Sequence, residues 1–531
     1  MLFKSHRRLL AALCVCVGCK TPDARSTKAE APDAHPVTLD GAPDRSPDKE
    51  TAGSSTPAPA GPRRMPDTFP RLAGAYVSSR EHPRVYETQA ELAEMAKRVN
   101  TAGSFSAQRF ERLVETVKKD LATKTDWDAS YSGCDIYVYL HTFSITVMAG
   151  YAGQTKSEQE LATAVNAGAG ASPPIGAALV ASRLALYAAL VKAGAHVPAG
   201  GPSASQATAT AKRILLAWAD HGFRESSGHF RDAAAQYCED GKPAKPIAVV
   251  LQIARGIVYS VQAHDLLAGL GALSADEASR AERFHGAMYD VIRAMSNEEY
   301  SHGIGGVHGD ELYNNQFAAH VNALVASARL LDDSKRLEAA LDGGDGALKV
   351  DLPFTKLFSY VVYGVDDQPL TRITPNSSDD PLKSSPAYSR GVVAPGEIND
   401  RFRNATVDQG IGYPMGTLEW LYMTAEVLRL AGYEPFAYRG THRQTIEMAT
   451  QYYACYAKAV GFDKTVTADA AKSCPDYEQY VGKVVIDVQT NAVMGAYRFP
   501  SNRAIVEVES AAKAAILHEG LDSVRFGRWR D

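Results

Sequence analysis

Apolar residues recur at three- and four-residue steps over most of the chain between residues 82 and 462. This spacing places them on one face of an α-helix, so it predicts a series of amphipathic helices. The predicted helices are Phe105–Thr123, Ile136–Tyr151, Pro174–Ala193, Ala207–His221, Ile247–Leu267, Ala275–Met295, Asn315–Leu331, Met415–Ala431 and Arg443–Ala459. Period-two patterns are scarce, and only Val484–Val488 and Ala504–Val508 predict a small β element near the C-terminus.

Short polar motifs mark where several of these helices begin and end. Thr88-x-x-Glu91, Ser274-x-x-Glu277 and Thr441-x-x-Gln444 have the spacing of capping boxes. Many helices stop at Ala-Gly, as at Ala431-Gly432, where glycine accepts the left-handed conformation that ends a helix. Helices of similar length joined by short turns, with no fixed repeat, predict an all-α fold. We expect stacked helical hairpins in an α/α toroid, or incomplete barrel, with a groove for a polymer.

The first residues have the pattern of a secretion signal. A basic start is followed by the apolar run Leu9–Val17, which is too short to span a membrane. Val17-Gly18-Cys19 resembles a bacterial lipoprotein cleavage box, so residues 1–19 predict a signal peptide with Cys19 as the lipidated residue. The alternative is plain secretion. We expect the mature protein to be lipid-anchored in the cell envelope, either in the periplasm or at the outer-membrane surface. The lipid is expected to be its only contact with the membrane.

Two further segments follow the predicted signal. Residues 20–70 are rich in Pro, Ala and Ser and carry almost no large apolar side chains, so they predict a disordered tether. Residues 71–531 are long enough and apolar enough to form the toroid domain. The net charge of -5 over 531 residues argues against general nucleic-acid binding. An anionic ligand would need a local cluster of cations.

Four cysteines remain after Cys19, and an even number in an oxidising compartment predicts disulfides. Cys455 and Cys474 are close in the sequence and are the first expected pair, which leaves Cys134 with Cys238. Their spacing does not resemble a zinc site, and we expect no metal. The sequence also contains no phosphate-binding loop or dinucleotide fingerprint, so no cofactor is expected.

Three stretches carry candidate chemistry. In the first, Asn314 or Asn315 caps a helix, and Gln316 and His320, four residues apart, share its face. Spacing alone favours a cap, a buried amide and a core histidine.

The second stretch, Gly396–Tyr438, places Arg401, Arg403 and Asp408 before Tyr413 at the start of a helix. Nearby arginine would lower the pKa of a tyrosine and allow it to abstract a proton. Tyr413 packing on the next helix is the alternative.

In the third stretch, Tyr137 and His141 lie on one face of a predicted helix and suit contact with a sugar. A partly buried helix start explains the same pattern.

Several segments together resemble the alginate-lyase superfamily of polysaccharide lyases. They are His82-Pro83-Arg84-Val85-Tyr86, Ile253-Ala254-Arg255-Gly256, Asn314-Asn315-Gln316 opening a helix that ends Leu331-Asp332-Asp333, and Gly412-Tyr413 ahead of Ala425-Glu426-Val427. The resemblance covers about Glu81–Gly440 and implies the α/α-toroid fold, with an anionic polysaccharide or oligosaccharide as partner.

The resemblance also implies residue roles. An asparagine, here Asn315, helps neutralise the uronate carboxylate, and a tyrosine, here Tyr413, acts as acid and base with an arginine, Arg403 or Arg401, before it. The histidine that follows the asparagine in the family is Gln316 here, and His320 is the nearest imidazole. Asn314 and Gln316 are then expected to bind substrate.

We therefore expect a lyase that cleaves a uronate-containing glycan by β-elimination. One alternative is a glycoside hydrolase on the same toroid, which needs two carboxylates across a sugar. Its candidates are Asp310, Glu311, Asp408 and Glu419. The other alternative is a non-catalytic glycan-binding lipoprotein, which the Gln316 substitution favours.

Overall fold

The computed structural model describes residues 68–122, 176–221, 238–239, 242–243, 246–302, 315–343, 353–365, 367, 393–399, 411–460, 465–475, 480, 488–517 and 522–531. The predicted signal peptide with Cys19 and nearly all of the predicted tether therefore lie outside the described residues. The same holds for the helix expected at Ile136–Tyr151.

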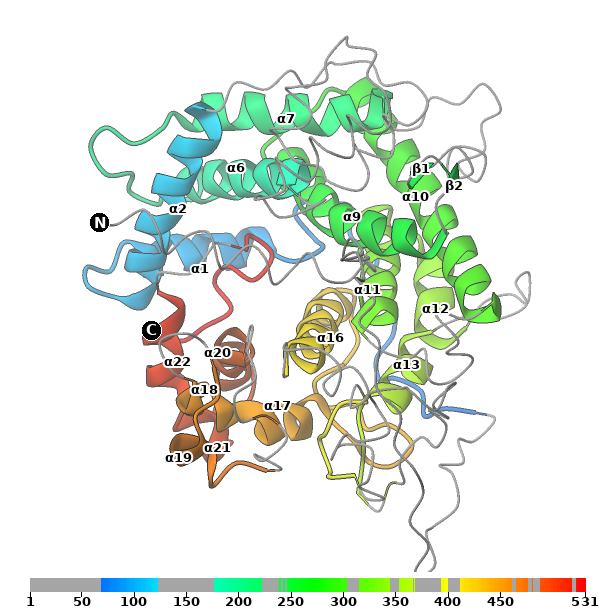
Figure 1. The fold of residues 1–531 in the computed structure, drawn as a ribbon. Helices are drawn as coiled ribbons and strands as arrows, with labels where there is room; N and C mark the ends of the chain where they lie inside the picture. The colour runs from blue at the N-terminus through cyan, green and yellow to red at the C-terminus, as the bar shows by residue number, and fades with distance from the viewer. Residues whose placement is uncertain are drawn as a thin grey trace, which may run out of the picture.

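The regular secondary structure of the described residues is almost entirely helical, which confirms the predicted all-α class (Figure 1). Up to residue 342, the described helices are α1 (Gln89–Val99), α2 (Phe105–Ala122), α6 (Gly176–Lys192), α7 (Ala204–His221), α9 (Pro246–Gly269), α10 (Ala275–His302), α11 (Asn315–Leu330) and α12 (Ser334–Asp342). After residue 342, they are α13 (Phe354–Val361), α16 (Gly412–Leu430), α17 (Ile446–Ala454), α18 (Tyr456–Ala459), α19 (Ala468–Ala471), α20 (Val488–Arg498), α21 (Arg503–Val506) and α22 (Glu509–Ile516).

The only sheet among the described residues is a two-residue antiparallel hairpin of β1 (Cys238–Glu239) and β2 (Lys242–Pro243). The C-terminal β element predicted at Ala504–Val508 is wrong, because α21 occupies most of that segment after Asn502 caps its first turn. Of Val484–Val488, only Val488 is described, and it begins α20.

Two of the three predicted capping boxes form. Thr88 accepts a hydrogen bond from the backbone of Glu91, whose carboxylate accepts one in return. The same reciprocal bonds join Ser274 and Glu277. The third prediction is wrong: Thr445 caps α17, so the helix begins later than Arg443. Gln444 instead donates its amide to the carbonyl of Ser359 at 2.9 Å.

The helices α11 and α16 lie side by side and run in the same direction. Near their middles, Asn322 Nδ2 donates to Thr424 Oγ1 at 3.2 Å. At their C-terminal ends, Arg329 Nη2 donates to the carbonyl of Leu430 at 2.9 Å. Both helices are buried on nearly every side, which is typical of helices in an inner layer.

Other inner helices have the same polarity. Asn491 Nδ2, near the start of α20, donates to the carbonyl of Met415 at 3.0 Å, near the start of α16. Towards the other end of the same pair, Arg498 contacts Glu426. Contacts also link α6 to α9 and α9 to α11, while α7, α10 and α12 pack outside them. The described helices thus form the inner and outer layers of an α/α toroid (Figure 1).

Residues 522–531, which we call the closing segment, complete the ring by returning to the first helical hairpin. Arg98 of α1 donates to the carbonyls of Gly527 and Trp529 at 3.0 and 2.7 Å. Ser106 of α2 binds both carboxylate oxygens of Asp531 at 2.9 Å. The toroid is therefore closed by contacts between the two ends of the described chain.

The closing segment also carries buried charge into the interior of the ring. Arg528 is 2% exposed, donates to the carbonyl of Tyr86 and lies 3.7 Å from Glu426. Ser523 accepts from Gln262 at 3.2 Å through its carbonyl. Because these groups come from α9, α16 and the closing segment, the interior of the ring is partly a polar network.

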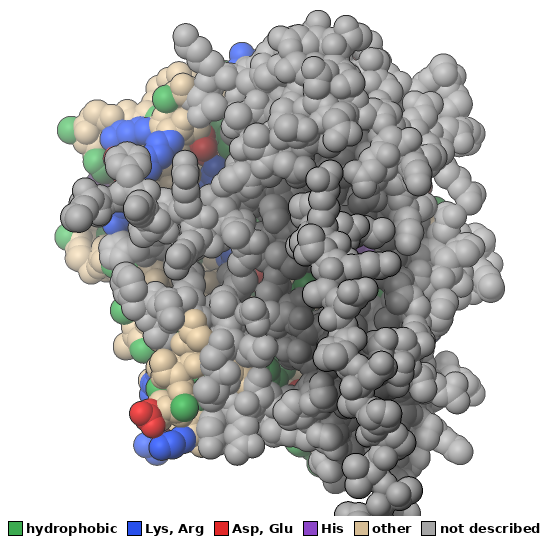
Figure 2. Space-filling view, in the orientation of Figure 1, with side chains coloured by type: hydrophobic (Ala, Val, Ile, Leu, Met, Phe, Trp, Pro, Cys, Tyr) green, Lys and Arg blue, Asp and Glu red, His purple; other side chains and the backbone are tan. Residues whose placement is uncertain are grey.

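The face seen in Figure 2 carries Lys and Arg side chains in small separate groups among polar and apolar ones. Over the described part of this face there is no broad basic patch. Among the helices that the structure describes, none combines the length and apolar character needed to cross a bilayer.

Candidate functional site

The N-terminal ends of α11 and α16 meet at one end of the ring, which we call the mouth. Asn315 is the first residue of α11 and is 4% exposed. Its Nδ2 would lie 3.8 Å from a Cβ atom placed on Gly416, in the first turns of α16. Glycine at 416 therefore lets the backbone of α16 approach the amide of Asn315, and residues far apart in the sequence become neighbours.

Tyr413 lies on the same side of α16 as Gly416, because residues three apart share a helix face. It is 7% exposed, yet it does not belong to the contiguous hydrophobic core of the described residues. Pro414 occupies the first turn, where its missing N–H is not needed. The start of α16 thus presents Tyr413 at the end of the ring where Asn315 lies.

Gln316 and His320 follow on α11 and are differently buried. Gln316 is partly exposed, whereas His320 is only 1% exposed. The ring of His320 contacts Phe317 edge-on and its Nδ1 lies 2.9 Å from Ser296 Oγ on α10. Burial, and then the charge of Arg255, lower the pKa of His320 to about 3. We therefore give His320 a packing role and no step in catalysis.

Below the mouth, the closing segment forms a charged layer with α16 and α9. Arg525 lies 3.3 Å from Glu419 of α16 and 3.2 Å from Asp522. Asp522 also accepts a hydrogen bond from Tyr259 of α9. Apart from Glu419, these groups, which we call the floor, were not predicted, because an alternation of charges in a short segment is also typical of an exposed surface.

Glu419, 8% exposed, is the only hydrolase candidate that the structure describes. Its carboxylate is paired with Arg525, and Asp522 is the other carboxylate on the same guanidinium. Both carboxylates therefore belong to an ion-pair cluster around one guanidinium, and we assign them no role in glycoside hydrolysis. Asp310, Glu311 and Asp408 lie outside the described residues.

The remaining predicted site residues also lie outside the described part of the chain. They are Asn314, Arg401, Arg403, Tyr137 and His141. Of the predicted constellation, the structure therefore brings together Asn315, Gln316 and the first turn of α16 with Tyr413.

The predicted disulfide between Cys455 and Cys474 forms, with 5.7 Å between their Cα atoms, and it joins the end of α17 to the segment after α19. The second predicted pair is untested, since Cys134 is outside the described residues and only the backbone of Cys238 is placed. In the described ranges, no three His, Cys, Asp or Glu side chains are grouped to hold a metal ion.

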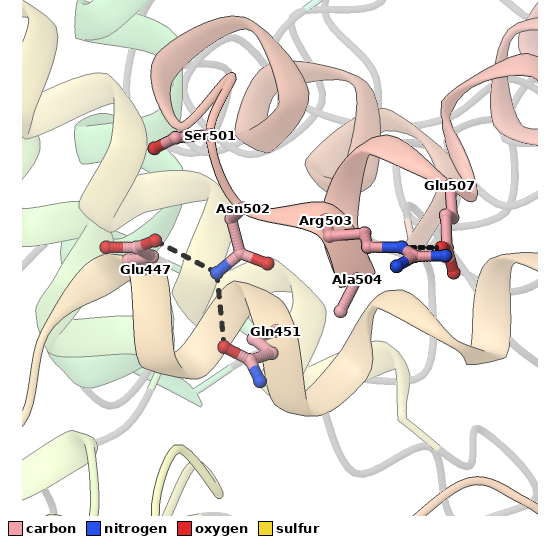
Figure 3. Close-up of a pocket in the computed structure, with 7 residues that line it drawn as sticks. All are labelled: Glu447, Gln451, Ser501, Asn502, Arg503, Ala504 and Glu507. Carbon is pink, nitrogen blue, oxygen red and sulfur yellow. Dashed lines mark hydrogen bonds and ion pairs between the residues drawn. The ribbon is translucent and has the colours of Figure 1, made fainter.

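An open pocket of about 550 Å³ lies between α17 and α21, and none of its lining residues belongs to α11 or α16 (Figure 3). Asn502 Nδ2 donates there to Glu447 at 2.9 Å and to Gln451 at 3.1 Å. Arg503 pairs with Glu507 at 2.6 Å. Because these groups satisfy one another, we assign the pocket no ligand and take the mouth as the candidate site.

Comparisons with known proteins give little beyond a distant likeness. No protein-family model matches the chain, and no curated protein matches it significantly in sequence. Among solved structures, the chain is similar to an alginate lyase from Bacteroides ovatus, with 10% identity and a TM-score of 0.45. The match covers 84% of this chain and 99% of that one. The helix contacts described above define the fold independently of this likeness.

Proposed function

We propose that the protein is a polysaccharide lyase that cleaves a uronate-containing glycan at the mouth of the toroid. The observation that carries this proposal is the approach of Asn315 to the first turns of α16, which present Tyr413. An amide donor and a phenol at one end of a ring are the two groups that β-elimination needs most.

In this reaction the side chain of Asn315 donates a hydrogen bond to the uronate carboxylate, which favours the enolate-like intermediate. Tyr413 removes the proton from C5 of the uronate, and the electron pair of the C5–H bond forms a double bond to C4. The bond between C4 and the bridging oxygen then breaks. Tyr413 returns a proton to that oxygen, so the products are an unsaturated uronate and a free hydroxyl.

The direction of the inner helices supports an anionic substrate. Helix N-termini carry partial positive charge, and those of α11 and α16 lie at the mouth. Arg401 and Arg403, which precede Tyr413 in the sequence, are proposed to lower the pKa of its phenol. Attachment through Cys19 and a place in the cell envelope are part of the same proposal.

The test is to incubate the protein with alginate, glucuronan and glycosaminoglycans and to follow the ultraviolet absorbance of the unsaturated uronate. We expect Tyr413→Phe to lower kcat by about a hundredfold or more, because the phenol is both base and acid. Tyr433→Phe, at the opposite end of α16, is the matched control and is expected to keep full activity. Absence of unsaturated product on every uronate polymer would refute the lyase function.

A second candidate function is glycan binding without cleavage. The observation that favours it is the low pKa and burial of His320 beside Gln316, which leave no imidazole base on this part of α11. Saturable binding of a uronate polymer with no product after long incubation would support this candidate.

A further inference from the structure

Arg255 lies on the face of α9 that points into the ring. Tyr259 and Gln262 follow it at four and seven residues, so the three side chains share one helix face. Both later residues contact the closing segment: Tyr259 bonds Asp522, and Gln262 Nε2 lies 3.2 Å from the carbonyl of Ser523. Arg255 lies on this face one helical turn before Tyr259, and therefore one turn closer to the start of α9 than the floor.

The polarity of the helices places Arg255 on the mouth side of the floor. Arg84 contacts Asp265 near the end of α9 and the carbonyl of Leu330 at the end of α11, so the two helices end at the same level. Their starts then face the same way. Side chains on a helix lean towards its N-terminus, so the long side chain of Arg255 extends towards the mouth.

Arg255 is also close to the predicted substrate-binding face of α11. After burial, the charge of Arg255 is the second cause of the lowered pKa of His320 on α11, and α9 and α11 pack against each other. Gln316 lies one turn before His320 on the same face of α11. The side chain of Arg255 therefore extends from α9 towards the side of the mouth where α9 and α11 are in contact.

Arg255 differs from Arg525 in having no counter-ion among the residues that the structure describes. Arg525 is held between two carboxylates. Arg255 is partly buried, and within the described residues no carboxylate or carbonyl pairs with it. A partly buried cation without a partner is costly in a folded protein, and it is a natural site for an anionic ligand.

We propose that Arg255 binds the carboxylate of the sugar unit held at Asn315 and so supplies the positive charge that Gln316 lacks. The inference rests on the proposed function for its substrate class. The planar guanidinium can donate two parallel hydrogen bonds to a carboxylate, whereas the amide of Gln316 contributes only neutral donors. Arg255 thereby makes the mouth selective for uronate over neutral sugar.

The experiment compares wild type, Arg255→Gln and Arg255→Lys, with Arg283→Gln on the exposed side of α10 as control. Calorimetry measures binding of a uronate oligosaccharide and of its carboxyl-reduced, neutral counterpart. We expect Arg255→Gln to weaken uronate binding about tenfold to a hundredfold and to leave binding of the neutral sugar unchanged. Arg255→Lys is expected to be intermediate, because it keeps the charge and loses the paired donors.

The outcomes separate this inference from the proposed reaction. If wild type binds uronate but forms no unsaturated product, the lyase function fails, while a selective loss in Arg255→Gln still supports the inference. Unchanged uronate binding in Arg255→Gln overturns the inference whatever the activity. If Arg255→Gln weakens binding of both sugars equally, the role of Arg255 is structural and the inference is overturned. A wild type that binds neither sugar also overturns the inference. Urea midpoints of each variant verify that the fold is retained.

Discussion

Replacing Glu426 by Gln would remove the carboxylate at which three parts of the ring meet. Glu426 of α16 is 1% exposed and is surrounded by three guanidinium groups from α16, α20 and the closing segment. These belong to Arg429, Arg498 and Arg528. Burial alone would raise the pKa of Glu426, but the three arginines hold it below its ordinary value.

The expected cost follows from what the substitution leaves behind. Arg528 is itself buried, and Gln at 426 would leave its charge and that of Arg498 without the shared anion. Removing one partner of a buried ion pair typically costs about 3–5 kcal/mol. We expect Glu426→Gln to lose at least this much of the free energy of unfolding, since the carboxylate serves more than one cation.

The assay is urea unfolding followed by circular dichroism, with the free energy taken from the midpoint and slope. Glu94→Gln is the matched control, because Glu94 pairs with Lys97 at 3.3 Å on the exposed side of α1. An exposed pair of this kind contributes about 0–1 kcal/mol. A Glu426→Gln variant within about 1 kcal/mol of wild type would show that the arginines find other partners and would refute this reasoning.

Two further predictions concern stability. Burial raises the pKa of Glu87 to about 8 from 4.5, so the folded protein keeps a proton that the unfolded chain releases as pH rises through this window. The free energy of unfolding of the wild type is therefore expected to fall between about pH 5 and about pH 9. The Glu87→Gln variant keeps a partner for Gln262 and is expected to lose less of this free energy over the same range. Urea midpoints of both proteins, measured at both pH values, test this. Replacing both Cys455 and Cys474 by Ser is expected to cost about 3 kcal/mol through the loop of 19 residues, and an unchanged melting temperature would contradict it.

The helices were the most predictable part of the fold, because their signals are local. The periodic pattern places the bounds of α2, α7 and α11 within a few residues of those in the structure. The pattern was less informative for α16, where one apolar stripe was expected. Trp420 and Met423 are buried as well, since an inner helix of a two-layered ring is contacted on all sides.

The candidate site was predictable only in part, because it depends on contacts between distant segments. The sequence marks Asn315 and Tyr413 as starts of two helices, but only the parallel packing of α11 and α16 makes them neighbours. Nothing local identifies Asp522 and Arg525 as buried partners of these helices, because both residue types are mostly found on surfaces. The burial of His320 was one of two open interpretations, and its contact with Ser296 favours that one.

The proposed function requires a chain with a net charge of -5 to offer a site to an anion, and the position of the closing segment is consistent with this. At the floor, the charges of Glu419 and Asp522 are partly offset by Arg525, which lies between them. On the mouth side of this layer, the partial positive charge of the helix starts and the unmatched charge of Arg255 are not cancelled by any described carboxylate. Charge near a ligand acts more strongly than charge across the protein, where salt screens it. In the proposed function, the local field at the mouth, rather than the overall charge, would therefore select the ligand.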